Sequence, residues 1–213
     1  MQNCLITGGT GFIGRYLVSI LDCNIRLLSR SYKVDVDTVI CDLKKDSILP
    51  NTLDGIDTVF HLAGLAHDMR DTSKVVDLYY KVNVNATVQL AKLAVKSGVK
   101  RFVFVSSVKA GGCSTPGKCA GEIDQEIPEG VYGKTKREAE LELLKIGKES
   151  GMHVAIIRPS LVYGPNVKGN LKLMLLGVSR GWFPPLPETG NKRSMIHVDD
   201  LVRAMLLVAE DVR

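Results

Sequence analysis

Tyr132 and Lys136 lie four residues apart in the segment YGKTK, and these residue types at this spacing suit proton transfer. On a helix, side chains four positions apart project from the same face. A phenol with an ordinary pKa of about 10 is a poor base at neutral pH, but a neighbouring ammonium group favours the phenolate. We therefore expect Tyr132 to act as a catalytic acid and base, with its pKa lowered by Lys136.

A serine hydroxyl stands where it would assist this tyrosine. The apolar run RFVFV, which has the composition of a buried strand, ends at Ser106 and Ser107. Open α/β sheets place their ligand contacts beyond the carboxyl ends of the strands. We predict that Ser107 holds the substrate oxygen beside Tyr132, and Ser106 is the alternative.

A glycine-rich turn, TGGTGFIG, lies near the N-terminus between an apolar run and an amphipathic stretch. Gly8 would permit the tight turn, Gly11 would let the backbone approach a pyrophosphate, and Gly14 would let helix and strand pack closely. Phe12 and Ile13, which follow Gly11, begin a helix whose N-terminal amides would face the phosphates. The turn predicts a site for NAD or NADP and, with the Tyr–Lys pair, a redox enzyme.

A second segment with small residues, FHLAG, ends the fourth apolar run. Its last three residues, Leu62, Ala63 and Gly64, would let the cofactor lie against the backbone. His61 in the same segment is predicted to be a packed structural residue rather than a catalyst.

The elements that must position these residues alternate along the chain. Short apolar runs of β type alternate with helical periodicity up to about residue 160, which predicts repeated βαβ units. Strands are expected near residues 3–7, 25–29, 38–41, 58–62, 101–106 and 153–158, and helices near 11–21, 79–97 and 132–150. From residue 159, glycines and prolines break the helical pattern into short pieces, which is typical of a loop-rich lid. The predicted fold is an α/β, Rossmann-type doubly wound parallel sheet with helices on both faces.

The composition excludes several classes of protein. The 213 residues, 45% of them hydrophobic, can bury one large core. There is no long apolar run and no signal-peptide pattern, so we expect a cytoplasmic protein without a membrane partner. The net charge of +5 is spread along the chain, which favours small anionic ligands over nucleic acid. Five cysteines and four histidines lack ligand spacing, so no disulfide framework and no metal site are predicted.

These segments together resemble the extended short-chain dehydrogenase/reductases, and within them the NAD-dependent epimerase/dehydratase family that acts on nucleotide sugars. The resemblance covers essentially the whole chain, and the segments that carry it follow the family's order: TGGTGFIG, CDL, HLAG, VNVNAT, FVFVSS, YGKTK, IRPSLVYGP and RSMIHVDD. Residues 164–170 and 191–194 look like the corresponding parts of bacterial UDP-N-acetylhexosamine 4-epimerases and UDP-4-keto-sugar reductases.

The resemblance implies further cofactor contacts. Asp42 and Leu43 would flank the adenine, Asn83 would steady the active-site helix through a water, and Pro159 would lie beside the nicotinamide. The second strand departs from the family pattern, because Arg30 stands where NAD-preferring members carry an acidic residue for the ribose. Arginine there suits a 2′-phosphate, so NAD and NADP both remain candidates.

The resemblance also implies substrate contacts in the C-terminal part. Arg193 would grip the diphosphate, for which a guanidinium fork is well suited, and Asn170 would line the substrate site. We expect a dinucleotide-binding domain at residues 1–160 and a partial substrate-binding segment at 161–213. The chain stops one helix after Arg193, so we expect this lobe to be short and incomplete, because the chain is either truncated relative to the family or has a minimal lobe.

The residues together with the family resemblance imply an NAD(P)-dependent oxidoreductase or epimerase acting at C4 of a UDP-hexose, in surface-polysaccharide precursor metabolism. Tyr132 would exchange the proton of the C4 oxygen, Ser107 would hold that oxygen, and Lys136 would tune Tyr132 and bind the nicotinamide ribose. A 4-epimerase would let the keto intermediate rotate, whereas a 4-keto reductase would release its product after one hydride transfer.

Two alternatives remain open at this point. A reductase of a non-sugar carbonyl would not need Arg193, and a non-catalytic dinucleotide-sensing scaffold would not need Tyr132 and Lys136. Extra apolar surface on the helices near 79–97 and 132–150 would serve a homodimer.

Overall fold

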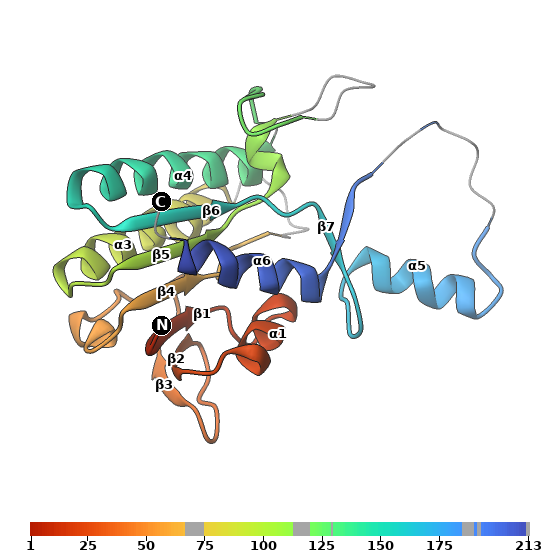
Figure 1. Cartoon of the computed structure of the whole chain (residues 1–213). Helices are drawn as coiled ribbons and strands as arrows, with labels where there is room; N and C mark the ends of the chain where they lie inside the picture. Colours follow the sequence, from red (N-terminus) through yellow and green to blue (C-terminus); the bar gives the residue numbers. More distant parts are fainter. Residues whose placement is uncertain (67–74, 113–119, 129, 185–189, 191–192, 212–213) are drawn as a thin grey trace.

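The computed structural model describes residues 1–66, 75–112, 120–128, 130–184, 190 and 193–211. Its centre is a sheet of six parallel strands with helices on both faces (Figure 1). The expectation of no disulfide framework and no metal site also covers Cys113, Cys119 and His67. These three residues lie outside the described part of the chain.

All six predicted strands form, and they pair in the order β3-β2-β1-β4-β5-β6. Their bounds are Asn3–Thr7 (β1), Asn24–Ser29 (β2), Asp37–Ile40 (β3), Thr58–His61 (β4), Arg101–Val105 (β5) and His153–Ile157 (β6). The chain moves outward from β1 in one direction and then restarts at β4 in the other. This reversal of strand order between β1 and β4 creates the crevice in which doubly wound folds bind ligands.

Apolar side chains of the strands alternate between the two faces of the sheet, and each face has its own helices (Figure 1). Leu5 of β1 packs with α3 (Ala86–Lys96) and α4 (Gly130–Ser150). Its neighbours Cys4 and Ile6 pack on the opposite face with residues of α1 (Phe12–Ile20) and α6 (Val198–Glu210). Both faces of the sheet are therefore buried, as parallel sheets require.

The helix predicted near 79–97 begins earlier and is not uniform. It starts as α2 (Val76–Tyr79), continues as a π-helical turn, η3 (Tyr80–Asn85), and becomes α3. π-Helical turns inside α-helices are frequent at functional sites. This one carries Asn83, one of the predicted cofactor residues.

The region after residue 160 is more regular than the sequence predicts. Two short strands, β7 (Leu161–Tyr163) and β8 (Met195–His197), pair in parallel, and α5 (Asn170–Ser179) stands between them in the sequence. The expectation of short broken pieces is wrong for α5, because its run of Leu, Lys and Met residues has high helix propensity. Residues 185–189 and 191–192 of the predicted lid lie outside the described part of the chain.

The last helix, α6, lies beyond the predicted boundary at residue 160 but packs into the core of the six-stranded sheet. Leu201, Val202 and Met205 are buried in one core cluster with residues of β1, β4 and β5, and α6 contacts β5 and β6 directly. Within the described ranges, no helix combines the length and apolar character needed to cross a bilayer.

Leu201→Ala should lower the free energy of unfolding by about 2–5 kcal/mol, because it removes a buried side chain and leaves a cavity. Leu207→Ala on the same helix is the matched control, since Leu207 is 69% exposed. Urea unfolding of both variants measures the difference. Equal and small losses would mean that α6 does not dock on the sheet.

Candidate active site

The glycine turn between β1 and α1 is held against the end of β4. Gly8 has a φ of +72°, and a Cβ at that position would lie 2.8 Å from the amide nitrogen of Ala63. Gly14 packs equally closely inside the turn, because its Cβ would lie 2.6 Å from Cα of Gly9. The Gly11 amide donates a hydrogen bond of 2.9 Å to the Gly8 carbonyl. Larger residues would open this turn.

The N-terminus of α1 is suited to phosphate. Gly11 is the N-cap residue and offers no side-chain acceptor, and the first turn of α1 contains no acidic residue. The amides of the first turn, which include those of Phe12 and Ile13, are therefore not neutralised by the protein. The closely packed glycines and these amides fit the pyrophosphate of a dinucleotide.

The start of α4 packs on the short 3-10 helix η4 (Val108–Gly111), and this contact brings Tyr132 to Ser107. Gly133 makes the approach possible, since a Cβ there would lie 2.7 Å from the carbonyl oxygen of Lys109. Ser107 is the N-cap residue of η4, and its side chain hydrogen-bonds to the phenol of Tyr132. The predicted catalytic serine and tyrosine are thus brought together.

The pKa of Tyr132 differs from the sequence-based expectation. Burial raises it above the ordinary value, the hydrogen bond from Ser107 lowers it, and the nearby Tyr79 raises it further. Lys136 does not lower it as predicted. The physical reason is that desolvation of the phenolate outweighs the single hydrogen bond that favours it.

Lys136 points into the core rather than to solvent. Its side chain is buried, its Nζ donates a hydrogen bond of 2.7 Å to the Val105 carbonyl, and it lies 4.0 Å from the centre of the Phe104 ring. Burial lowers the pKa of Lys136 to about 7, and the carboxylate of Glu140 opposes this shift. The ammonium group is therefore only partly charged at neutral pH.

Asn83 links the end of β4 to α4. Its Oδ1 accepts a hydrogen bond of 2.7 Å from the Leu65 amide, and its Nδ2 donates to the Leu65 carbonyl at 3.0 Å. The same Nδ2 donates to Oγ1 of Thr135 at 3.1 Å, so the contact with the helix of Tyr132 and Lys136 is direct. The water-mediated contact implied by the resemblance stays a prediction.

The remaining predicted cofactor residues lie along the carboxyl edge of the sheet. Arg30 is exposed just after β2, and Asp42 and Leu43 follow β3. The residues after β4 end at Gly64, where a Cβ would lie 3.2 Å from Asn83 Oδ1 and 3.8 Å from Lys136 Nζ. Leu62 and Ala63 precede it in the same segment, and the Pro159 carbonyl accepts from the Val108 amide at 3.2 Å.

Arg193 is not brought to this cluster by any contact in the described part of the chain, and the side chain of Asn170 is not among those described. Arg193 is exposed just before β8, and Asn170 is the first residue of α5. Both therefore remain predictions.

A partly buried ion pair behind the site was not predicted. Glu140 is 1% exposed, four residues after Lys136, and both its oxygens accept hydrogen bonds from the guanidinium of Arg158. Arg158 also donates to Oε1 of Gln125 at 3.0 Å. The sequence signal was available, because Lys136 and Glu140 have helical spacing and a lone carboxylate on a buried face needs a cationic partner.

The sheet topology, the phosphate turn and the Tyr–Lys pair define a Rossmann-fold enzyme of the extended short-chain dehydrogenase/reductase type. The chain belongs to the NAD dependent epimerase/dehydratase family, whose profile matches residues 4–213. The family name agrees with the predicted dinucleotide cofactor.

The chain is similar to several characterised proteins. It is 39% identical over 213 residues to a UDP-glucose 4-epimerase of Vibrio cholerae, covering 94% of this chain and 64% of the relative. It is 32% identical to an N-acetyl-alpha-D-glucosaminyl-diphospho-ditrans,octacis-undecaprenol 4-epimerase of Escherichia coli O157:H7, covering 94% of this chain and 61% of the relative. The structure of MoeE5 in complex with UDP-glucose and NAD matches with a TM-score of 0.83 and 30% identity, covering 98% of this chain and 72% of that one. The chain thus spans less than two thirds of these two sequence relatives.

Lys136→Met should change how stability depends on pH. The pKa of Lys136 is about 7 in the folded state and 10.5 ordinarily, so between these values the unfolded state binds a proton that the folded state has released. The Lys136 contribution to the free energy of unfolding therefore rises with pH in this window, by up to about 1.4 kcal/mol per pH unit. Below pH 7 both states are protonated and the slope vanishes.

Urea unfolding between pH 6 and pH 9 measures this contribution. The wild-type protein should gain stability relative to Lys136→Met as the pH rises. Lys134→Met, which removes an exposed lysine from the same helix, is the control and should follow the wild type. Parallel curves for all three proteins would contradict the buried position of Lys136.

Proposed function

We propose that this protein is an NAD(P)-dependent enzyme that acts at C4 of a UDP-hexose, as a 4-epimerase or a 4-keto reductase, in surface-polysaccharide precursor metabolism and in the cytoplasm. The observation that carries the proposal is the arrangement of Ser107, Tyr132 and Lys136 at the carboxyl edge of the sheet, next to a turn shaped for a dinucleotide. A scaffold that only sensed a dinucleotide would have no need to bury a lysine beside a tyrosine.

The names of the relatives support the reaction and the position on the sugar. Both sequence relatives are 4-epimerases, and both names describe a sugar joined to a diphosphate. MoeE5 holds UDP-glucose together with NAD. A non-sugar carbonyl substrate would share neither the diphosphate nor the position of attack.

The protein's own groups have separate roles in this proposal. Tyr132 takes the proton from the C4 hydroxyl and later returns it, and the Ser107 hydroxyl fixes the C4 oxygen. Lys136 is assigned to bind the nicotinamide ribose from its buried position behind the phenol. The glycine turn and the first amides of α1 bind the pyrophosphate. A bound dinucleotide, held by these residues, would supply the hydride chemistry at C4.

Tyr132→Phe should lower turnover of a UDP-hexose by at least about 100-fold, because the variant lacks the group that moves the proton. The affinity for the dinucleotide should stay within a few-fold, because little binding surface is lost. Tyr32→Phe, which changes a tyrosine that is 65% exposed, is the control. Turnover is measured as formation of the C4 epimer or of reduced dinucleotide, and near-normal turnover by Tyr132→Phe would refute the mechanism.

The choice between NAD and NADP is assigned to Arg30 in this proposal. Arg30 is exposed directly after β2, at the edge of the sheet where a dinucleotide ribose would lie. A charge-assisted hydrogen bond to a 2′-phosphate contributes about 1.5–3 kcal/mol.

Arg30→Asp should therefore weaken NADP binding by about tenfold or more and change NAD binding little. Lys33→Asp, an exposed lysine in the same loop, controls for general charge effects. Titration of the three proteins with both cofactors gives the affinities. An Arg30→Asp protein that binds NADP as well as the wild type would show that Arg30 does not contact the cofactor.

The substrate diphosphate is assigned to Arg193 and the sugar side of the site to Asn170. Support comes from their place in segments that resemble the family and from the matching of a guanidinium fork to phosphate oxygens. The division into a dinucleotide domain at 1–160 and a partial substrate segment at 161–213 belongs to the same proposal.

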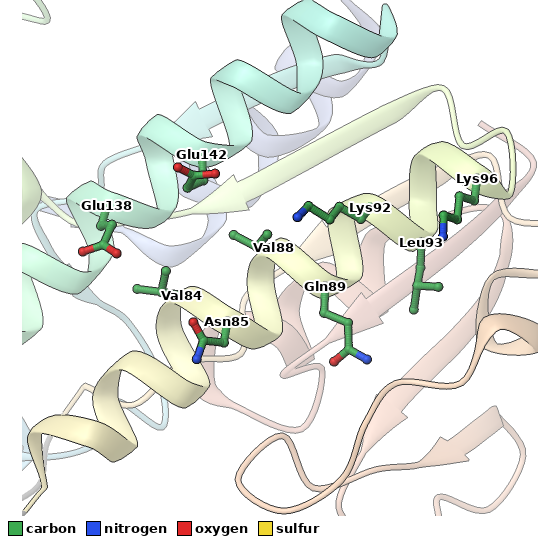
Figure 2. A pocket seen from close by; sticks show the side chains of 9 residues that line it. All are labelled: Val84, Asn85, Val88, Gln89, Lys92, Leu93, Lys96, Glu138 and Glu142. Carbon is green, nitrogen blue, oxygen red and sulfur yellow. The ribbon is translucent and has the colours of Figure 1, made fainter.

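We also propose that the protein forms a homodimer through α3 and α4. An open groove lies between these helices, lined by Val84, Asn85, Val88, Gln89, Lys92, Leu93, Lys96, Glu138 and Glu142 (Figure 2). Lysines line its α3 side and glutamates its α4 side, and Leu141 of α4 is 55% exposed nearby in the sequence. A two-fold axis would set α3 of one copy against α4 of the other and pair these opposite charges.

Leu141→Lys should convert the dimer to a monomer, because it adds a charge to an apolar contact and meets lysines of the facing helix. Leu207→Lys on α6 is the control, since Leu207 is exposed on a helix that covers the other face of the sheet. Light scattering after gel filtration gives the masses. A wild-type monomer, or an unchanged dimer for Leu141→Lys, would contradict this interface.

A further inference from the structure

A continuous chain of hydrogen bonds crosses the core behind the site, with His61 at its centre. The ring Nδ1 is 2.6 Å from Oγ1 of Thr7, and the ring Nε2 is 2.8 Å from Oγ1 of Thr87. The three side chains are all 0% exposed. These hydrogen bonds join Thr7, the last residue of β1, to Thr87 of α3 through His61 at the end of β4.

The neighbouring bonds fix the direction of the chain. The hydroxyl of Thr87 donates to the Asn83 carbonyl at 2.9 Å, so its oxygen is free to accept from the ring. His61 Nε2 must then carry the proton, and Nδ1 must accept. The hydroxyl of Thr7 can donate to Nδ1, because its oxygen already accepts a hydrogen bond of 3.0 Å from the Ala63 amide. With the Thr87 hydroxyl donating to the Asn83 carbonyl, the neutral Nε2–H tautomer satisfies both ring nitrogens.

The surroundings of the ring favour its neutral form. The ring stacks on Phe104 at 5.6 Å between centroids and 18° between planes, and the Nζ of Lys136 lies 4.0 Å from the centre of the same phenyl ring. The imidazole faces the uncharged side chains of Thr7 on β1 and Thr87 on α3. The charged group near the ring is Lys136. Burial and the charge of Lys136 lower the pKa of His61 to about 3.

The two ends of the chain reach the two halves of the site. At one end, the Ala63 amide lies against the glycine turn, since it is the nearest atom to a Cβ built on Gly8. At the other end, Asn83 continues to Thr135, whose hydroxyl lies 3.1 Å from the Tyr132 carbonyl. The chain therefore connects the dinucleotide turn with the helix of the catalytic tyrosine.

We propose that His61, as the neutral Nε2–H tautomer, is a positioning residue that couples the dinucleotide turn to the helix carrying Tyr132. The ring does not touch the reacting atoms. It holds Ala63 and Asn83 at a fixed separation. The position of the dinucleotide turn relative to the active-site helix is therefore fixed. The inference rests on the proposed cofactor site, but the state of the ring itself can be measured without a cofactor.

The test uses three threonine variants of the whole protein. Thr87→Val removes the hydroxyl that accepts from His61, while Thr87→Ser keeps it. Thr52→Val is the matched control, because the Thr52 hydroxyl is buried and has no hydrogen-bond partner among the described residues. Nitrogen-15 NMR gives the tautomer of His61, the 13Cζ signal of Tyr132 reports on the active-site helix, and titration gives the affinity for NAD.

The wild-type protein should show the Nε2–H tautomer, unprotonated down to about pH 4. Thr87→Val should shift the Tyr132 signal and weaken NAD binding three- to tenfold, although α3 lies away from the turn. Thr87→Ser should restore both, and Thr52→Val should change neither. An Nδ1–H or charged ring, or an unmoved Tyr132 signal in folded Thr87→Val, would overturn the role of His61. Failure of the wild type to bind NAD or NADP would instead refute the proposed function, since the two NMR measurements need no ligand.

Discussion

The burial of polar and ionisable side chains at one edge of the sheet is the constraint on which the rest of this structure depends. Thr7, His61, Asn83, Thr135 and Lys136 are each at most 3% exposed. A buried polar group without a partner costs free energy, so each of these must find donors or acceptors inside the protein. The partners lie on different strands and helices, and satisfying all of them fixes how those elements meet.

Close backbone approach is the second requirement, and glycine meets it where the elements of the site touch. Gly8 brings the dinucleotide turn against Ala63, and Gly133 brings the first turn of α4 against η4. The first contact joins the cofactor turn to the end of β4, and the second joins Tyr132 to Ser107. The buried Lys136 lies in the same region, and its Nζ donates a hydrogen bond to the Val105 carbonyl at the end of β5. Cofactor cradle and catalytic residues are thus parts of one packed unit.

Much of the fold was predictable because it follows from periodicity. Each of the six strands was expected from a short apolar run, and the parallel sheet followed from their alternation with helices. The π-helical turn at 80–85 was not, because a shift of the hydrogen-bond pattern by one residue leaves no trace in hydrophobic spacing. The helix α5 was missed because the glycines and prolines around it dominate the local composition.

The candidate site was predictable where spacing carries the chemistry, and less so where packing does. The Tyr132 and Lys136 pair and the glycine turn have recognisable patterns, whereas Thr7 and Thr87 are ordinary residues until the fold brings them to one ring. The pKa of Tyr132 was mispredicted for the same reason. Helical spacing predicts a lysine near the phenol, but only the packed structure shows that burial of the phenol outweighs the hydrogen bond from Ser107.

The most direct test of the central claim is whether the hydride at C4 of a UDP-hexose moves to the dinucleotide on this protein. A UDP-hexose carrying deuterium at C4 would be mixed with the protein loaded with NAD or NADP, and the nicotinamide would be analysed by mass spectrometry after rapid quenching. The sugar would be analysed by NMR in the same samples. The account predicts that wild type either inverts C4 with the deuterium still on that carbon or transfers the deuterium to the nicotinamide. Recovery of all the sugar with its C4 configuration and its deuterium unchanged, with both ligands shown to be bound, would contradict it.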